Sequence, residues 1–174
     1  MSTISKKICL IGDFGVGKTS LIRRFVDRQF SDKYLSTVGV KISRKSLEII
    51  DSQAGKNLIL QLLIWDIEGS TKFKGVSASY FQGAKGAIID GDVTRPESLE
   101  NISEHIQAFT KVNPQGKTVI ALNKSDLIDA EYLEKYRHIY SFSDNKSFVS
   151  TYASSAKTGK NVDEIFQSLA NSMI

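Results

Sequence analysis

Gly12-Asp13-Phe14-Gly15-Val16-Gly17-Lys18-Thr19 is the stretch that decides the fold, because it fits the phosphate-binding pattern G-x-x-x-x-G-K-[ST]. The short, mostly apolar run at 7–11 predicts a buried strand before it. Apolar residues at helical spacing predict a helix after it: Leu21, Ile22, Phe25 and Val26. Strand, glycine-rich loop and helix in this order form a site whose backbone N–H groups and helix dipole attract phosphate.

Two side chains of this stretch have predicted roles. Lys18 would reach the β- and γ-phosphates of a nucleotide, and the hydroxyl of Thr19 would bind Mg²⁺. The flanking strand and helix disfavour a chance glycine-rich turn. Residues 13–15 also spell the D-F-G of protein kinases, but no H-R-D-like loop follows and the chain is too short for a kinase.

The composition predicts one globular domain over residues 1–174. Of these residues 41% are hydrophobic and 24% are charged, which suits a full core under a charged surface. The net charge of +4 fits ordinary solvated surface better than an anionic partner. Cys9 is the only cysteine, which excludes a disulfide framework and predicts a small core residue. His105 and His138 lack metal-ligand spacing, so we assign both to surface or core packing.

The order of elements predicts an α/β fold. Strands are expected at 38–50 and 58–65, as a hairpin around the polar turn at 51–57. Further strands are expected at 86–89, 118–122 and 148–153, alternating with helices at 96–109, 131–140 and 162–169. This alternation is typical of a parallel sheet. No apolar run approaches the ~20 residues that span a membrane, and we expect a cytoplasmic protein.

Four loops are predicted to meet at one edge of this sheet, because ligands of open parallel sheets bind at the carboxyl ends of the strands. They are residues 12–19, Asp66, 123–126 and 154–157. Asp66 is the candidate acid of a Mg²⁺ site. The carboxylate of Asp126 can accept hydrogen bonds from the N1–H and 2-amino group of guanine, a pairing that adenine does not offer.

These motifs resemble the small GTPases of the Ras superfamily over essentially the whole chain, and most closely the Rab branch. The resemblance is carried by residues 12–21, Ser36-Thr37-Val38-Gly39-Val40, Trp65-Asp66, Tyr80-Phe81-Gln82-Gly83-Ala84, Asp92-Val93-Thr94, Asn123-Lys124-Ser125-Asp126 and Ser155-Ala156-Lys157-Thr158-Gly159. It implies a P-loop NTPase fold with a six-stranded, mostly parallel sheet, one antiparallel hairpin strand and about five helices.

The resemblance also implies GTP or GDP as ligand, with Mg²⁺. Phe30 would pack on the guanine, Lys124 would cover the base, and the backbone N–H of Ala156 would reach the guanine oxygen. The implied nucleotide-binding set is Asp13, Phe14, Gly15, Val16, Gly17, Lys18, Thr19, Ser20, Phe30, Tyr34, Thr37, Asp66, Gly69, Asn123, Lys124, Asp126, Ser155, Ala156 and Lys157. The implied Mg²⁺ set is Thr19, Thr37 and Asp66, and the implied catalytic set is Lys18, Thr37, Gly69 and Ser70.

Two departures from the family pattern fall on the hydrolysis machinery. Where Rab-like proteins read W-D-T-A-G-Q-E, residues 65–71 read W-D-I-E-G-S-T, so Ser70 replaces the glutamine that orients the attacking water. Phe14 stands where relatives have glycine or a small residue. Its ring would either obstruct the γ-phosphate or turn outward, since spacing does not fix side-chain direction. The chain ends at Ile174 without a terminal cysteine, so we expect no lipid anchor in it.

Three functions compete. The first is a switch that hydrolyses GTP slowly and presents its switch surface to an effector, an exchange factor and a GTPase-activating protein. The second is a GTP-holding scaffold that barely hydrolyses and recruits partners constitutively. The third, a P-loop kinase of a small metabolite, leaves 123–126 unexplained. We expect a monomer without a nucleic-acid partner, in contact with membranes only through other proteins.

Overall fold

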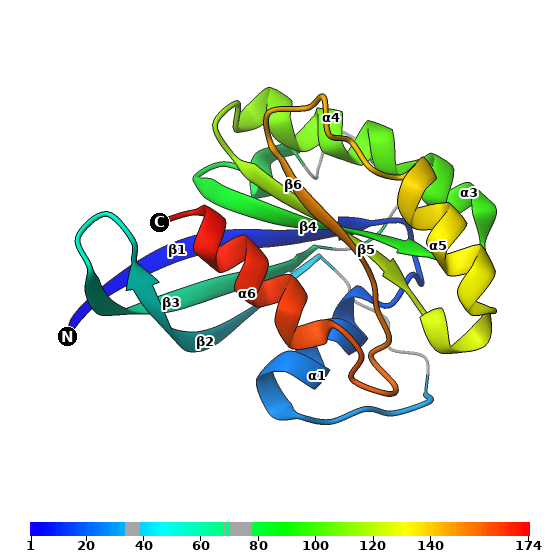
Figure 1. The fold of residues 1–174 in the computed structure, drawn as a ribbon, viewed down its shortest axis with the longest axis horizontal. Coiled ribbons are helices and arrows are strands. Elements are labelled where there is room, and N and C mark those ends of the chain that lie inside the picture. The colour runs from blue at the N-terminus through cyan, green and yellow to red at the C-terminus, as the bar shows by residue number, and fades with distance from the viewer. Residues whose placement is uncertain (34–38, 68, 70–77) are drawn as a thin grey trace.

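The computed structural model describes residues 1–33, 39–67, 69 and 78–174. A six-stranded sheet in the order β2-β3-β1-β4-β5-β6 forms the centre, with helices on both faces (Figure 1). The elements are β1 (Ser2–Gly12), α1 (Lys18–Asp27), β2 (Val40–Asp51), β3 (Lys56–Ile67), β4 (Ala84–Asp92), α3 (Pro96–Glu100), α4 (Ile102–Val112), β5 (Lys117–Asn123), the short 3₁₀ helix Ser125–Leu127, α5 (Ala130–Ile139), β6 (Phe148–Ala153) and α6 (Val162–Ser172).

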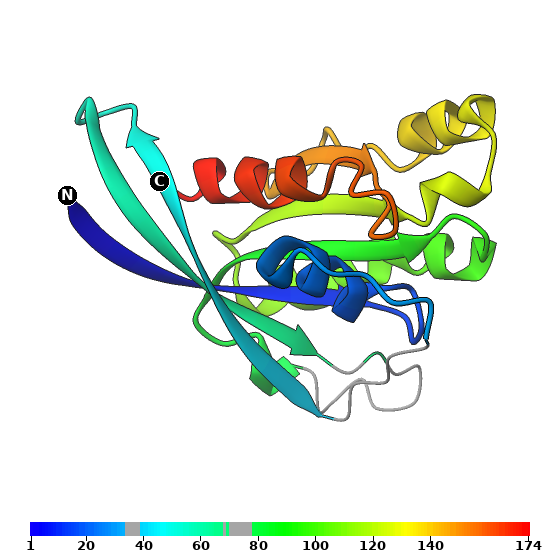
Figure 2. The same cartoon turned by 90° about the horizontal axis from the view of Figure 1, so that it is seen from below.

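Among the strands of the described residues, only the pair β2 and β3 is antiparallel, and all other neighbouring strands run parallel. The predicted fold class is therefore confirmed. The hairpin turn is stabilised by Asp51, whose Oδ1 accepts hydrogen bonds from the backbone N–H groups of Gln53 (2.9 Å) and Ala54 (3.0 Å). The hairpin and the start of β1 extend beyond the helices (Figure 2).

The sheet separates two hydrophobic cores, which explains why its inner strands read as continuous apolar runs. Leu10 faces the core built with α1 and α6, whereas Ile11 faces the core built with α4. In the first core the rings of Phe25 and Phe166 stack with centroids 3.9 Å apart, joining α1 to α6. Because α1 begins directly at the phosphate-binding loop, this stack attaches the helix that follows the loop to α6.

Cys9 lies in the second core with no exposed surface, as predicted. Its Sγ lies 3.8 Å from the carbonyl oxygen of Tyr80. Burial raises the pKa of the Cys9 thiol to about 12, against a smaller opposing effect of the Lys7 charge.

Several boundaries differ from the prediction. β1 begins at Ser2 rather than at 7, because its polar first residues pair with β3 through backbone hydrogen bonds. β4 continues past Ile89 to Asp92. The helix predicted at 96–109 is divided into α3 and α4 at Asn101, whose side chain hydrogen-bonds outside the helix.

None of the helices in the described ranges combines the length and the apolar character needed to cross a bilayer.

Candidate functional site

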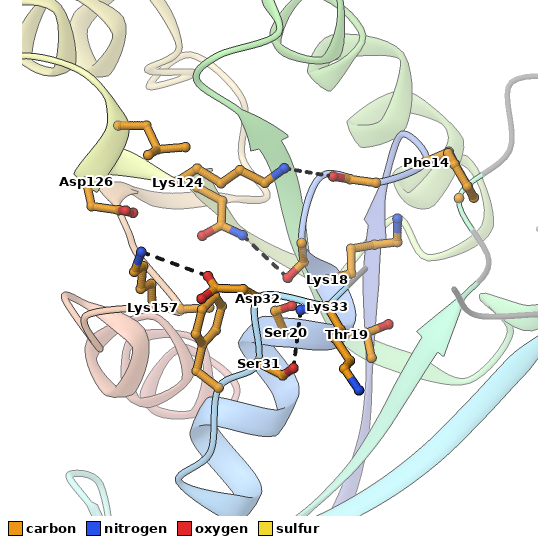
Figure 3. A pocket seen from close by; sticks show the side chains of 17 residues that line it. Phe14, Lys18, Thr19, Ser20, Ser31, Asp32, Lys33, Lys124, Asp126 and Lys157 are labelled. Atoms are coloured by element: carbon orange, nitrogen blue, oxygen red, sulfur yellow. Dashed lines mark hydrogen bonds and ion pairs between the residues drawn. The ribbon is translucent and has the colours of Figure 1, made fainter. Parts of the chain in front are cut away.

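A cavity of about 350 Å³ opens at the carboxyl ends of the parallel strands (Figure 3). The phosphate-binding loop and the start of α1 form one wall, and the loops after β5 and β6 form the other. The lining residues are Phe14, Gly15, Gly17, Lys18, Thr19, Ser20, Phe30, Ser31, Asp32, Lys33, Gly69, Asn123, Lys124, Asp126, Leu127, Ala156 and Lys157. Residues of three of the four loops predicted to meet here line the cavity, and Asp66 is hydrogen-bonded to the lining residue Thr19.

The phosphate-binding loop curls around the ammonium group of Lys18. Its Nζ donates to the carbonyl oxygens of Gly12 and Asp13, at 3.0 Å each. Gly15 and Gly17 adopt positive φ of 75° and 103°, and a Cβ on Gly17 would lie 2.3 Å from Asn123 Nδ2. Glycine is required at Gly17 both by the left-handed backbone and by this close approach.

Lys18 is 6% exposed, and burial lowers its pKa. The negative charges of Asp90, Asp66 and Asp13, in that order, oppose this effect, and Arg95 adds to it. A buried ammonium group inside a glycine-rich loop is suited to hold an anion.

Oxygen ligands suited to Mg²⁺ meet beside Lys18. The hydroxyl of Thr19 donates to Asp66 Oδ2 at 2.6 Å, which joins the first turn of α1 to the end of β3. A hydroxyl and a carboxylate fit Mg²⁺, which binds few protein oxygens together with phosphate oxygens and water. Accordingly, the described part of the chain holds no cluster of three His, Cys, Asp or Glu side chains that would bind a metal alone. Thr37, the third predicted ligand, lies outside the described residues.

The far end of the cavity is built by the loops after β5 and β6. Asn123 Nδ2 donates to the carbonyl of Val16 at 3.0 Å. Lys124, with a left-handed φ of 63°, donates to Gly15 O at 3.1 Å and pairs with Asp92 at 2.7 Å. These contacts tie the loop after β5 to the phosphate-binding loop.

Asp126 is exposed and lines the cavity (Figure 3). The hydroxyl of Ser155 donates to Asp126 Oδ1 at 2.7 Å. Ser155 is itself fully buried and follows β6. The carboxylate is therefore positioned before any ligand arrives.

Four lining residues were missed by sequence reasoning: Ser31, Asp32, Lys33 and Leu127. Asp32 lies 3.9 Å from Lys157 Nζ across the cavity, so two separate loops meet there (Figure 3). Their only sequence signal was adjacency to the predicted Phe30 and Asp126.

Asp13, Val16, Asp66 and Ser155 do not line the cavity but lie buried around it. Asp13 points away, toward α4, where its Oδ1 is 2.7 Å from His105 Nε2 and its Oδ2 accepts from Asn101 Nδ2 at 2.7 Å. Burial alone would raise the pKa of Asp13, but the hydrogen bonds to His105 and Asn101 lower it overall. His105 was assigned to surface or core packing, and the structure adds a contact of its ring with Asp13.

Gly69 presses against the phosphate-binding loop. A Cβ on it would lie 2.6 Å from Lys18 Nζ, 2.7 Å from Phe14 N and 2.8 Å from Asp13 C. Phe14 both lines the cavity and remains 51% exposed, and Arg95 Nη1 donates to its carbonyl oxygen at 2.6 Å. Tyr34 and Ser70 lie outside the described residues.

Comparison with known proteins agrees with this geometry. The Ras family model matches residues 7–174. The GTP-binding protein ypt1 of Schizosaccharomyces pombe is 36% identical over 167 residues, which cover 94% of this chain and 77% of that protein. The Ras-related protein Rab-13 of Canis lupus familiaris is 34% identical over 169 residues, covering 97% and 79%, and that of Mesocricetus auratus is 35% identical over 174 residues, with the same coverage. With its phosphate-binding loop, its Asn-Lys-x-Asp loop and these relatives, the chain belongs to the Ras family of small GTPases, close to the Rab branch.

Proposed function

We propose that this protein is a guanine-nucleotide switch that binds GDP or GTP with Mg²⁺, hydrolyses GTP slowly and signals through its switch regions. The observation that carries the proposal is the placement of Asp126, held by Ser155 at the opposite end of the cavity from Lys18. A ligand that spans this cavity offers phosphates at one end and a base at the other.

Guanine selectivity would follow from Asp126. An ionised carboxylate only accepts hydrogen bonds, and guanine offers two donors on one edge. Lys124 is anchored to Gly15 and Asp92, so its stem would lie along the base. Phe30 lines the same part of the cavity and would supply an apolar surface to the ring.

Phosphate and metal binding would divide between Lys18 and the pair Thr19–Asp66. Mg²⁺, when bound, neutralises charge on the phosphate oxygens. Thr19 would hold the ion from α1, and Asp66 orients the Thr19 hydroxyl at 2.6 Å. Thr37 would complete this set in the GTP-bound state.

Slow hydrolysis would follow from Ser70 and Phe14. Phosphoryl transfer relies on positioning and on charge stabilisation. The glutamine that orients the attacking water in Rab-like proteins supplies one positioning contact. Serine is too short to make that contact directly. Phe14 would hinder the approach of an arginine from an activating protein, because its ring stands at the mouth of the cavity.

A GTP-holding scaffold is the second candidate, and the same half-exposed Phe14 favours it. In both cases an effector and an exchange factor would bind at the switch surface. The scaffold differs from the switch in requiring almost no turnover, so it needs no activating protein.

The base contact is tested by Asp126→Asn. We expect GTP binding to weaken by roughly 2–4 kcal/mol, because a charged acceptor is lost at the guanine edge. Asp129→Asn is the matched control, since Asp129 is exposed nearby but does not line the cavity. Equal GTP affinity of the parent and Asp126→Asn in a titration, or ATP competing as well as GTP in the parent, would refute guanine specificity.

The rate is tested by single-turnover GTP hydrolysis. The parent is compared with Ser70→Gln and with Ser70→Gln combined with Phe14→Gly. Losing one positioning contact typically costs on the order of 10²-fold, so we expect the double variant to be the fastest. Measurable turnover in the parent supports the switch, and turnover at background supports the scaffold. A parent faster than the double variant would contradict the roles given to both residues.

A further inference from the structure

β2 is an open edge of the sheet. Among the strands of the described residues it stands at one end of the order, and it pairs over its whole length, Val40–Asp51, with β3 alone (Figure 1). The register of this pair runs without a bulge. The backbone N–H and C=O groups of β2 that point away from β3 therefore meet no other strand of the described chain. A long and regular edge of this kind is a template for pairing with a further strand.

The side chains along β2 place two large apolar groups in water. Ile42 is 50% exposed and Ile50 is 70% exposed. Both lie on the same face of the sheet, because residues an even number of positions apart in a strand share a face. Arg44 and Glu48 lie between them on this face, are exposed, and form no ion pair with any residue in the described ranges. Apolar groups and charges on this face are thus available to a partner.

The order of the residues makes β2 complementary to a second copy of itself. Two antiparallel copies of one strand are related by a two-fold axis, so one residue faces its own copy and the residues on either side face each other in pairs. Both sets of charges then join opposite signs, and the two exposed isoleucines meet. With Ser46 on the axis, the facing pairs are Lys41 with Asp51, Ile42 with Ile50, and Arg44 with Glu48.

Shifting the axis by one residue destroys this match. With Lys45 on the axis, the two copies of this lysine face each other. With Leu47 on the axis, Arg44 faces Ile50. Opposite charges and apolar pairs stabilise facing strands, whereas like charges directly opposite each other destabilise them. The side chains of β2 therefore favour the register centred on Ser46 over its neighbours.

We propose that β2 is an interface between two copies of this chain, which pair antiparallel about Ser46 and join their sheets into one. Each facing pair occurs twice because of the two-fold axis. Charges on an edge strand usually keep other strands away, but here opposite signs stand symmetrically about Ser46 and attract a second copy. The hairpin end of β2 extends beyond the helices, which leaves it accessible (Figure 2). The dimer departs from the monomer expected from the sequence, and it goes beyond the proposed function, because none of the described residues of β2 lines the nucleotide cavity.

The charges of this interface are tested by reversing them one at a time. Arg44→Glu sets a glutamate opposite Glu48, and Glu48→Arg sets an arginine opposite Arg44, so each variant replaces attraction by repulsion at two symmetric places. We expect each variant to dimerise at least about tenfold more weakly than the parent in sedimentation equilibrium over a series of protein concentrations. Both residues are exposed, and neither shapes the hairpin turn as Asp51 does.

A mixture of the two variants is the decisive measurement. Between unlike chains, the new glutamate of one variant faces the new arginine of the other, and the unchanged Glu48 faces the unchanged Arg44. The attraction is restored, so an equimolar mixture should dimerise about as tightly as the parent. A variant weakened only by a damaged fold would not be rescued in this way.

Ser46→Cys tests the position of the axis. Facing residues of antiparallel strands have Cα atoms about 4.5–5.5 Å apart, which lies within the range that a disulfide spans. Mild oxidation should therefore convert Ser46→Cys into a covalent dimer on a non-reducing gel. Ser43→Cys on the same strand is the matched control, because the two copies of residue 43 would lie about 20 Å apart. Cys9 has no exposed surface and does not take part.

Circular dichroism verifies that each variant is folded, and the crosslink decides the case if a charge variant is not. A parent that sediments as a monomer at every concentration would overturn the proposal. A mixture of the charge variants that stays monomeric, or equal crosslinking of both cysteine variants, would overturn it as well and leave the edge to a different extended chain. None of these outcomes bears on nucleotide binding, so the proposed function is tested separately.

Discussion

The surroundings of Gly69 leave no space for a larger side chain at this position. An added methyl group would collide with the backbone of Phe14 and Asp13 as well as with the flexible end of Lys18, at 2.6–2.8 Å. Backbone atoms cannot retreat cheaply in a packed structure. The loop and the end of β3 must therefore separate if Gly69 acquires a side chain.

We predict that Gly69→Ala weakens GTP binding by roughly 1–3 kcal/mol, the range typical of overpacking. Calorimetric titration of nucleotide-free protein measures the change. Gly116→Ala is the control, because its Cβ would meet the Phe109 ring at 2.6 Å, far from the cavity. That variant should lose stability but keep its affinity, and a similar loss of affinity in both would speak against a local effect.

At the same scale, the phosphate-binding loop was predictable because its pattern fixes both chemistry and backbone. Asp90 was not predictable as a buried group, since an acid after two isoleucines reads as the end of a strand. Ser31, Asp32 and Lys33 carry no motif and enter the cavity only because their loop folds back over it.

At the scale of elements, α4 holds the phosphate-binding loop from outside. Asn101 and His105 bind the two carboxylate oxygens of Asp13, and Arg95, ahead of α3, binds the carbonyl of Phe14. The loop is therefore fixed from two sides, by α4 and by the loop after β5. The sequence predicted one helix here, because helical periodicity does not reveal that Asn101 interrupts it to reach Asp13.

We predict that Asn101→Ala lowers the free energy of unfolding by about 1.5–3 kcal/mol at neutral pH, the value of a hydrogen bond to a charged group. The pKa of Asp13 is lowered in the folded state, so its stabilising contribution is present above its unfolded value of 3.8 and is lost as pH falls below it. The variant weakens that contribution. In urea unfolding, the difference in the free energy of unfolding between parent and variant should therefore become smaller below pH 3.8.

The exposed Gln107→Ala on α4 is the control, and it should differ little from the parent at any pH. If the free energy of unfolding of Asn101→Ala differs from that of the parent by the same amount at neutral and at acidic pH, Asn101 acts through α4 alone and not through Asp13.

At the scale of the whole molecule, the two cores join the sheet to the site. The core built with α1 and α6 holds the helix that follows the phosphate-binding loop, and the Phe25–Phe166 stack joins α1 to α6 there. The alternation of strands and helices was enough to predict this arrangement, since neighbouring parallel strands need a crossover connection, which is usually a helix. The described β2–β3 hairpin was also predicted, but its length was not, because polar residues at strand ends pair through backbone atoms alone.

We predict that Phe166→Ala lowers the free energy of unfolding by roughly 3–5 kcal/mol, as expected for a large buried ring replaced by a cavity. Denaturation must be compared at one fixed nucleotide concentration, because bound ligand stabilises the folded state. Tyr132→Ala on the surface of α5 is the control and should change stability by no more than about 0.5 kcal/mol. Equal losses of stability in the two variants would contradict the contribution given to the Phe25–Phe166 stack.

The reaction of the single thiol, Cys9, with a labelling reagent can report on the opening of the sheet. Only a thiolate reacts quickly with disulfide or alkylating reagents, and Cys9 is both without exposed surface and shifted to a pKa of about 12. Labelling of the native protein must therefore wait until β1 separates from its neighbours. β1 lies between β3 and β4 in the middle of the sheet. With excess reagent, the rate of Cys9 labelling would therefore measure how often the centre of the sheet opens, which is a rare and large fluctuation of the fold. No probe has to be added to the sequence.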